Sequence, residues 1–436
     1  MGASSNPKLT HHHHHHHREG NIKVFLISDV HFDAKENERF IEQMPSFLNN
    51  NNNKDDDCYS ILIIAGDVAE KLSDLERCLR MCLKKFDCVF YTFGNHDLWC
   101  ASKEEEEEKC SLEKIQSVFK LCERLGVKTD PSSGEEIGGS NDDDAKRRVF
   151  IAPVHSWYER EFDTEEEVEA PEGVSIPGVE RVMTDYRLCK WPKLDAWKKE
   201  ITTTTTTIKS DDYYISKKID ALNDADGKFE RFLENVKRAK EEGKDVTVIT
   251  FSHFLPRIEL IPEKRFLLYP KLTQAVGSHI LNERIERVTE ILHLGKSGKD
   301  SHTHAFGHTH FGWNLVLENN VRYVQAALAT PKEWVRRPRS LVVGEFFSNA
   351  PGNSPLLLYD SRTNAFSGSS SNIKEYNPGL WAKYYEENAR DSSNKTLAPW
   401  VLSYVSRVWG SRELKKSMMM TSNTDASPLP GKSGQV

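Results

Sequence analysis

The feature that most constrains this 436-residue chain is a set of short apolar runs, each ending at polar residues. The runs cover residues 23–29, 61–67, 89–95 and 246–252. They are rich in β-branched and aromatic residues and too short for typical helices, so we expect buried strands. Loops at the carboxyl ends of such strands assemble binding sites, and the polar residues that follow the four runs are therefore expected to converge.

Five polar blocks follow in a fixed order along the chain. They are Asp29-Val30-His31, Gly66-Asp67, Gly94-Asn95-His96-Asp97, His253 and Gly307-His308-Thr309-His310. Two cations about 3.5–4 Å apart, joined by a bridging carboxylate, are the usual clamp for cleaving a phosphate ester, because they neutralise its charge and activate water. Imidazole, carboxylate and amide ligands without cysteine favour Mn, Fe or Zn over Ca. The residue types therefore predict two transition-metal ions.

The order and spacing of the blocks resemble the calcineurin-like metallophosphoesterase superfamily. Residues 97–99, 154–158, 254–270 and 323–326 further resemble a poorly characterised branch of it from plants, algae and bacteria. The resemblance runs from about residue 21 to about 346 and implies an α/β sandwich with two central mixed β-sheets flanked by helices. It implies one metal site made of Asp29, His31, Asp67 and His310, and a second made of Asp67, Asn95, His253 and His308. Asp67 is then the bridge.

His96 is predicted to be a catalytic residue rather than a ligand. It directly follows Asn95, so it lies in the same loop and can donate a proton to the leaving alkoxide, with Asp97 orienting it and keeping it charged. The resemblance implies this role or stabilisation of the transition state.

Each block also has an ordinary explanation when it is taken alone. A single Gly-Asp after a strand is more often a turn or a helix cap, and a single histidine such as His253 is usually a satisfied polar residue. All five blocks in order make that explanation inadequate. Two further histidines near the last block are not assigned to the site, because His302 and His304 lack a preceding glycine. We expect His302 in a loop and His304 buried in a hydrogen bond.

The ligand positions also determine the domain organisation, because Asp29 and His310 must meet. We expect a disordered tail over 1–20 that includes the histidine run 11–17, and one phosphoesterase domain over 21–360. A C-terminal extension follows over 361–416, with an amphipathic helix near 399–412, and then a disordered tail over 417–436. Polar insertions are expected near 49–57, 104–108, 134–147, 163–179 and 202–212.

Charge limits the choice of substrate. The net charge of −7 and the absence of a sustained basic stripe disfavour a long nucleic acid, which leaves a small phosphoester or a nucleotide. Arg257 and Arg265 follow His253 closely and are candidates for binding a phosphate oxygen. The equally weighted alternative is that both arginines stay on the surface or pair with Glu259 and Glu263.

Cysteine usage and hydropathy suggest the compartment. The eight cysteines form no Cys-x-x-Cys pair, and neither a signal peptide nor a membrane-spanning stretch is recognised, so a cytoplasmic protein is the default, with organellar import as the weaker alternative. The helix near 399–412 is expected to dock on its own domain, and a protein partner or a membrane surface is the alternative.

These observations predict an enzyme that hydrolyses a small phosphomonoester, phosphodiester or nucleotide by metal-activated hydroxide attack. Two alternatives stay open. One is a catalytically silent metal-binding scaffold, and the other is a protein phosphatase or nuclease of the same superfamily.

Overall fold

The computed structural model describes ten segments of the chain. They are residues 21–48, 58–100, 110–132, 134–136, 147–202, 209–292, 301–336, 355–363, 365–366 and 380–415. The two predicted tails and the insertions at 49–57 and 104–108 lie outside these residues. So do most of the insertion at 134–147, the middle of the one at 202–212, and the apolar run 341–347, whose composition indicates a further strand.

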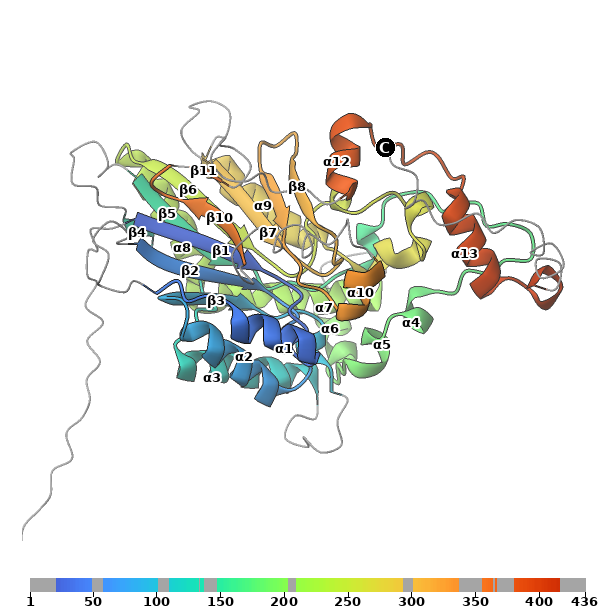
Figure 1. Ribbon diagram of the computed structural model, residues 1–436, viewed down its shortest axis with the longest axis horizontal. Helices are drawn as coiled ribbons and strands as arrows, with labels where there is room; N and C mark the ends of the chain where they lie inside the picture. The colour runs from blue at the N-terminus through green and yellow to red at the C-terminus, as the bar shows by residue number, and fades with distance from the viewer. Residues whose placement is uncertain are drawn as a thin grey trace, which may run out of the picture.

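Two mixed β-sheets form the centre of the fold, as the sequence predicted (Figure 1). The first has the order β11 (Ala365–Phe366), β10 (Leu356–Asp360), β1 (Asn21–Ile27), β2 (Cys58–Ala65), β3 (Cys88–Thr92). The second has the order β4 (Glu135–Glu136), β5 (Arg147–Pro153), β6 (Asp245–Phe251), β7 (Ser301–Phe306), β9 (Arg322–Gln325), β8 (Trp313–Val316). Strands β1, β2 and β3 are mutually parallel, and so are β5, β6, β7 and β9. In each sheet, the carboxyl ends of several strands therefore lie side by side at the same end of the sheet.

The two sheets pack face to face through apolar side chains of alternate strand positions. Val24 and Leu26 of β1, Ile63 of β2 and Ile249 of β6 are buried in this shared layer. The intervening positions of the same strands face outward and are also buried, because helices cover them. Strands buried on both faces explain why the sequence shows continuous apolar runs rather than alternation.

Helices cover the outer faces of both sheets. The helices are α1 (Lys35–Gln43), α2 (Leu72–Leu83), α3 (Ser111–Leu125), α4 (Val179–Val182), α5 (Asp185–Leu188), α6 (Leu194–Thr202), α7 (Asp211–Asp220), α8 (Lys228–Glu241), α9 (His279–Leu292), α10 (Pro331–Arg336), α12 (Leu380–Glu387) and α13 (Pro399–Trp409). Helices α1, α2 and α3 pack on the first sheet, and α8 and α9 pack on the second. The result is a four-layer α/β sandwich.

Two local sequence patterns fold differently from their simplest interpretation. The apolar spacing over residues 217–240 indicates a single helix, but α7 and α8 are separate, because Asp226 and Gly227 between them adopt positive φ angles of 53° and 66°. The Asn319-Asn320 pair indicates a two-residue hairpin loop, but the loop between β8 and β9 has three residues, with Asn320 in the left-handed region at φ 58°. Local turn chemistry at single residues decides both cases.

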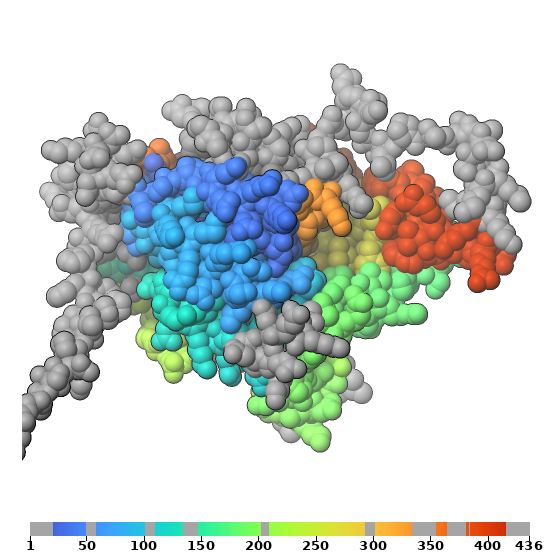
Figure 2. Space-filling model, turned by 60° about the horizontal axis from the view of Figure 1, so that its bottom comes forward, coloured from blue at the N-terminus to red at the C-terminus, as the bar shows by residue number. Residues whose placement is uncertain are grey.

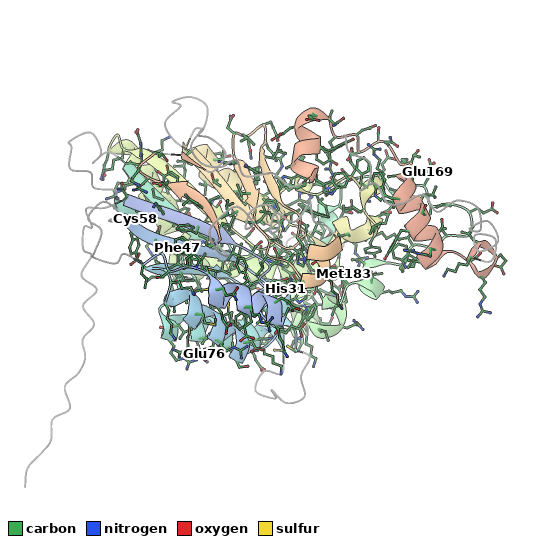
Figure 3. All side chains as sticks on the ribbon, in the orientation of Figure 1. His31, Phe47, Cys58, Glu76, Glu169 and Met183 are labelled. Carbon is green, nitrogen blue, oxygen red and sulfur yellow. The ribbon has the colours of Figure 1, made fainter. Side chains whose placement is uncertain are left out.

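The C-terminal helix α13 docks on the protein's own surface. Val401 and Val405 are fully buried in a cluster with Phe266, whose ring stacks on Trp400 with centroids 5.8 Å apart. The segment near Glu169 runs beside α13, and Glu169 N–H donates to the carbonyl of Lys395 (Figure 3). In the space-filling view the C-terminal segment lies against the middle part of the chain, away from the N-terminal part (Figure 2). Helix α13 thus has the docking role that its amphipathic pattern predicted.

Among the described helices, none combines the length and the apolarity needed to cross a membrane.

Helix α13 offers a test of this docking. Val405→Ala removes two buried methyl groups and should lower the free energy of unfolding by about 2 kcal/mol. Leu402→Ala on the same helix is the matched control, because Leu402 is 41% exposed and its truncation should cost less than about 0.5 kcal/mol. Urea titration followed by tryptophan fluorescence measures both changes. Equal losses in the two variants would contradict the packing of α13.

Candidate metal centre

The strand ends bring all seven predicted ligands together. One ligand atom each of Asp29, His31, Asp67 and His310 lie within 4.8 Å of one another, and so do those of Asp67, His253 and His308. The remaining predicted ligand, Asn95, has its Oδ1 atom 3.0 Å from both His253 Nε2 and His308 Nδ1. The site lies at the sheet edge opposite to Cys58, the first residue of β2, as the positions of His31 and Cys58 show (Figure 3). Asp67 belongs to both groups of atoms.

The backbone at the site adopts an unusual conformation. Of the eight non-glycine residues with positive φ in the described part of the chain, five are predicted ligands: Asp29, His31, Asp67, His308 and His310. Left-handed φ values cost free energy for residues with a side chain, and such strain concentrates at functional sites. All five of these residues contribute a ligand atom to the two clusters.

Two glycines of the predicted blocks are required for close approach. A Cβ atom at Gly66 would lie 2.4 Å from His253 Nδ1, and one at Gly94 would lie 2.1 Å from Asp67 Oδ1. Any side chain at these positions would displace a predicted ligand. The two glycines therefore contribute to the site because the absence of a side chain leaves room for His253 and Asp67.

The imidazoles are oriented so that one ring nitrogen of each faces the centre. His253 Nδ1 donates to the carbonyl of Ala65 at 3.0 Å, and His308 Nε2 donates to the carbonyl of Ala275 at 2.9 Å. Since a carbonyl oxygen only accepts, these bonds place a proton on His253 Nδ1 and on His308 Nε2, so that the other nitrogen of each ring is the one that faces the centre. Second partners of this kind are typical of metal-binding histidines.

Charge in the cluster fits a cation site. Burial lowers the pKa of His31 and of His308, so both rings offer lone pairs. Burial also lowers the pKa of His253, but the charge of Asp67 outweighs it and raises the value to about 9. Asp67, in turn, has its pKa raised to about 6 by burial, although His253 opposes the rise. The buried carboxylates therefore hold positive charge beside them, which a metal ion supplies when it displaces the protons.

Comparison with known proteins agrees with this geometry. Residues 22–183 match the calcineurin-like phosphoesterase family. The matched residues include the first three of the five predicted blocks, so this part of the chain is similar to that family.

Individual relatives are more distant. The [acyl-carrier-protein] phosphodiesterase PptH of Mycobacterium tuberculosis is 28% identical over 143 residues, which are 31% of this chain and 41% of the relative. The crystal structure of phosphopantetheinyl hydrolase (PptH) from M. tuberculosis covers 73% of this chain and 94% of its own, with 19% identity and a TM-score of 0.41. A dimetal phosphatase from Danio rerio covers 70% and 86%, with 12% identity and a TM-score of 0.30.

Two carboxylates behind the ligands were missed by sequence reasoning. Glu333 Oε2 accepts from His310 Nδ1 at 2.7 Å and from the Thr330 backbone N–H at 3.1 Å. Asp185 Oδ1 accepts from Asn95 Nδ2 at 2.9 Å and so directs the amide oxygen of Asn95 towards the centre. A Thr-x-x-Glu capping box at the start of α10 was a readable sign of Glu333. No comparable pattern marks Asp185.

The predicted partnership of His96 and Asp97 is wrong. Asp97 is buried, and its two carboxylate oxygens accept four backbone N–H groups, those of Asp67, Val68, Ala69 and Gly94, at 2.8–3.0 Å. His96 instead packs on Trp99, with ring centroids 3.6 Å apart, and its Nε2 lies 4.0 Å from Asp67 Oδ2. Burial and the neighbouring histidines lower the pKa of His96, so Asp97 does not keep it charged. Adjacent residues in this short helical turn point in different directions.

The two candidate phosphate-binding arginines are engaged elsewhere. Arg257 pairs with Glu259 at 2.9 Å and with Glu318 at 2.5 Å. Arg265 lies 3.9 Å from the ring centroid of Phe266 and 3.8 Å from Glu263. The pairing that the sequence left open as the alternative is therefore the one observed.

The two histidines excluded from the site lie in a strand. His302 is buried in β7 and contacts Thr250 Oγ1 at 2.8 Å, so its expected loop position is wrong. His304 is also buried and contacts Thr250 Oγ1 and Ser252 Oγ at 2.9 and 3.0 Å, as expected. Neither side chain belongs to the candidate metal centre.

The role of Asp97 can be tested by an isosteric change. Asp97→Asn places an amide NH2 opposite two of the four backbone donors, and should lower the free energy of unfolding by about 3 kcal/mol, because buried N–H groups lose their acceptor. His96→Ala, from a side chain that is 25% exposed, should cost less than about 1 kcal/mol. Urea titration of both variants makes the comparison. An Asp97→Asn protein as stable as the parent would show that Asp97 does not hold these loops.

Proposed function

We propose that this protein is a dinuclear-metal-dependent phosphoesterase that hydrolyses a small phosphomonoester, phosphodiester or nucleotide. The observation that carries the proposal is the pair of ligand clusters that share Asp67. The family supports the reaction class, and the name of the M. tuberculosis relative, a phosphodiesterase, favours a phosphodiester among the three substrates.

The ligand set supports two transition-metal ions such as Mn, Fe or Zn. Asp29, His31, Asp67 and His310 would hold one ion, and Asp67, Asn95, His253 and His308 the other, with only nitrogen and oxygen donors. Two bound ions supply Lewis-acid activation of water and neutralise the charge of the phosphoryl group.

The protein residues would orient the substrate and serve the leaving group. His96 is more accessible to a substrate than the buried Asp67 beside it, since its side chain is 25% exposed whereas that of Asp67 is 2% exposed. Its Nε2 lies 4.0 Å from Asp67 Oδ2, where even a neutral ring with its proton on Nε2 would donate a hydrogen bond to the departing oxygen. Trp99 packs against His96 and holds its ring, which is the function that the sequence had given to Asp97.

We further propose a cytoplasmic location and consider where a protein partner could bind. None of the eight cysteines, all of which lie in the described part of the chain, forms a disulfide, and this fits a reducing cytoplasm. Because the apolar face of α13 already packs on the domain, a protein partner at this helix would have to use its exposed side, at Leu402 and Val408.

The metal-ligand assignment is tested by removing single donors. Asp67→Asn and His308→Ala should each reduce hydrolysis of bis(4-nitrophenyl) phosphate by more than about a hundredfold, which exceeds the usual loss for residues behind the ligands. The number of metal ions bound per protein molecule should also be lower in each variant than in the parent, because each substitution removes a metal ligand. His279→Ala, outside the centre, is the control and should keep parental activity. After chelation, the parent should recover activity with Mn.

Two results would contradict the assignment. Full activity in either ligand variant would show that these residues do not hold the metals. A metal-loaded parent that hydrolyses no member of a broad phosphoester panel would favour a binding scaffold over an enzyme.

The role of His96 is tested by varying the leaving group. His96→Ala should slow hydrolysis of an alkyl phosphodiester more than that of the 4-nitrophenyl ester, by a further factor of about 10 or more, because a poor leaving group needs a proton donor. The kcat values for both substrates, measured in parent and variant, give this factor. Equal losses for the two substrates would mean that His96 does not donate to the leaving oxygen.

A further inference from the structure

Glu333 connects helix α10 to the candidate metal centre through one carboxylate oxygen. Its Oε2 atom lies 2.7 Å from His310 Nδ1, 3.1 Å from the backbone nitrogen of Thr330 and 2.8 Å from Thr330 Oγ1. An ionised carboxylate only accepts hydrogen bonds, so the His310 ring carries its proton on Nδ1. The other ring nitrogen, Nε2, is then the one available to a metal ion.

The available nitrogen of His310 lies inside the first cluster of ligand atoms. His310 Nε2 is 3.0 Å from His31 Nε2 and 3.4 Å from Asp29 Oδ1. The second cluster found among the described residues does not include His310. An influence of Glu333 through His310 is therefore directed at one of the two proposed ions.

His310 differs from two other histidines of the centre in its second hydrogen-bond partner. The second ring nitrogens of His253 and His308 donate to the backbone carbonyls of Ala65 and Ala275. That of His310 donates to a carboxylate. A carboxylate partner fixes the orientation of a metal-binding imidazole and raises the basicity of its other nitrogen. The first cluster therefore has a histidine with a charged support.

The fold fixes the place of Glu333 independently of His310. The N–H of Ala329 donates to the carbonyl of Asp29 at 2.9 Å, and Nδ2 of the buried Asn37 donates to the carbonyl of Ala329 at 2.8 Å. These bonds tie the start of α10 to the strand end that carries Asp29. A carboxylate held in this way can orient a ring instead of following it.

We propose that Glu333 is a positioning residue for the metal centre. It holds the His310 ring so that Nε2 binds the ion of the first cluster, and it thereby raises the affinity for that ion. Glu333 acts through His310 and needs no contact with the substrate. The inference rests on the proposed dinuclear centre, to which it adds a residue.

The same contact couples the ion to helix α10. If Glu333 strengthens binding of the ion, the bound ion must in turn strengthen the contact between Glu333 and His310, because such coupling is reciprocal. The oxygen that accepts from His310 also accepts from Thr330 in the capping box at the start of α10. Occupation of the first cluster should therefore stabilise the first turn of this helix.

The first test measures Mn²⁺ binding to the chelated full-length protein by equilibrium dialysis. Mn²⁺ is the probe because it binds nitrogen ligands most weakly among the common first-row ions, which limits binding to the histidine run 11–17. Glu333→Ala should weaken the binding of one of two ions by about tenfold or more, and that of the other less than twofold. Lys332→Ala is the matched control, because Lys332 is exposed on the same helix, and it should change neither affinity by more than twofold.

A conservative variant separates orientation from charge. Glu333→Gln keeps an oxygen acceptor for His310 and should restore the affinity to within about threefold of the parent. Equal losses in Glu333→Ala and Glu333→Gln would overturn the positioning role. Parental affinity for both ions in Glu333→Ala would overturn it as well, and so would equal weakening of both ions.

Asp67→Asn distinguishes this proposal from the metal centre on which it rests. If Asp67→Asn reduces Mn²⁺ binding and Glu333→Ala does not, only the role of Glu333 is wrong. If neither variant reduces Mn²⁺ binding, the assignment of the centre is wrong and this proposal is refuted with it.

The second test needs only the parent protein and so does not depend on the folding of a variant. Hydrogen–deuterium exchange of residues 327–336 should slow at least about threefold when Mn²⁺ is added to the chelated protein. In Glu333→Ala the exchange rate should no longer respond to Mn²⁺. Exchange in the parent that is independent of Mn²⁺, or an undiminished response in Glu333→Ala, would contradict the coupling of α10 to the ion.

Discussion

The position of Asp67 is the constraint on which the rest of the site depends. Its carboxylate is buried beside Asp29, His253 and His96, where an unpaired charge would be costly. One of its oxygens, Oδ1, accepts from the backbone N–H of His96 at 2.9 Å, and the other, Oδ2, lies 3.4 Å from His253 Nε2. Each oxygen of Asp67 therefore has a separate direction, which is what a residue shared between two cation sites requires.

Backbone hydrogen bonds keep the ligand loops in register with one another. The N–H of His31 donates to the carbonyl of Asp67, and the N–H of His308 donates to Asp29 Oδ1 at 2.8 Å. Asp97 joins the loops after β2 and β3 through four N–H groups. A ligand loop thus cannot move without breaking bonds to the next, and this coupling offsets the strain of five left-handed residues.

Sequence reasoning identified the predicted ligands that follow the ends of strands. It missed residues that other elements of the fold bring to the site. The apolar runs and the order of the polar blocks were sufficient to place Asp67, His253 and the others at one edge of the fold. Asp185 lies on a four-residue helix without a recognisable pattern, and only the folded chain brings it to Asn95. Asp97 was misassigned because proximity along the chain says nothing about side-chain direction in a short helical turn. Arg257 also pairs with Glu318, which is 61 residues away along the chain and which sequence reasoning did not identify as its partner.

Asn95 shows how the fold beyond the strands controls the centre. As a neutral ligand it has no charge to orient it, so its direction depends on the hydrogen bond from its amide group to Asp185. The same oxygen of Asp185 accepts from Trp99 Nε1 at 2.7 Å, and Trp99 also packs on His96. One buried carboxylate on α5 thereby positions both Asn95, a predicted metal ligand, and Trp99, on which the His96 ring packs. Because burial raises the pKa of Asp185, its charge depends on these donors, and a change in its surroundings would act on Asn95 and His96 together.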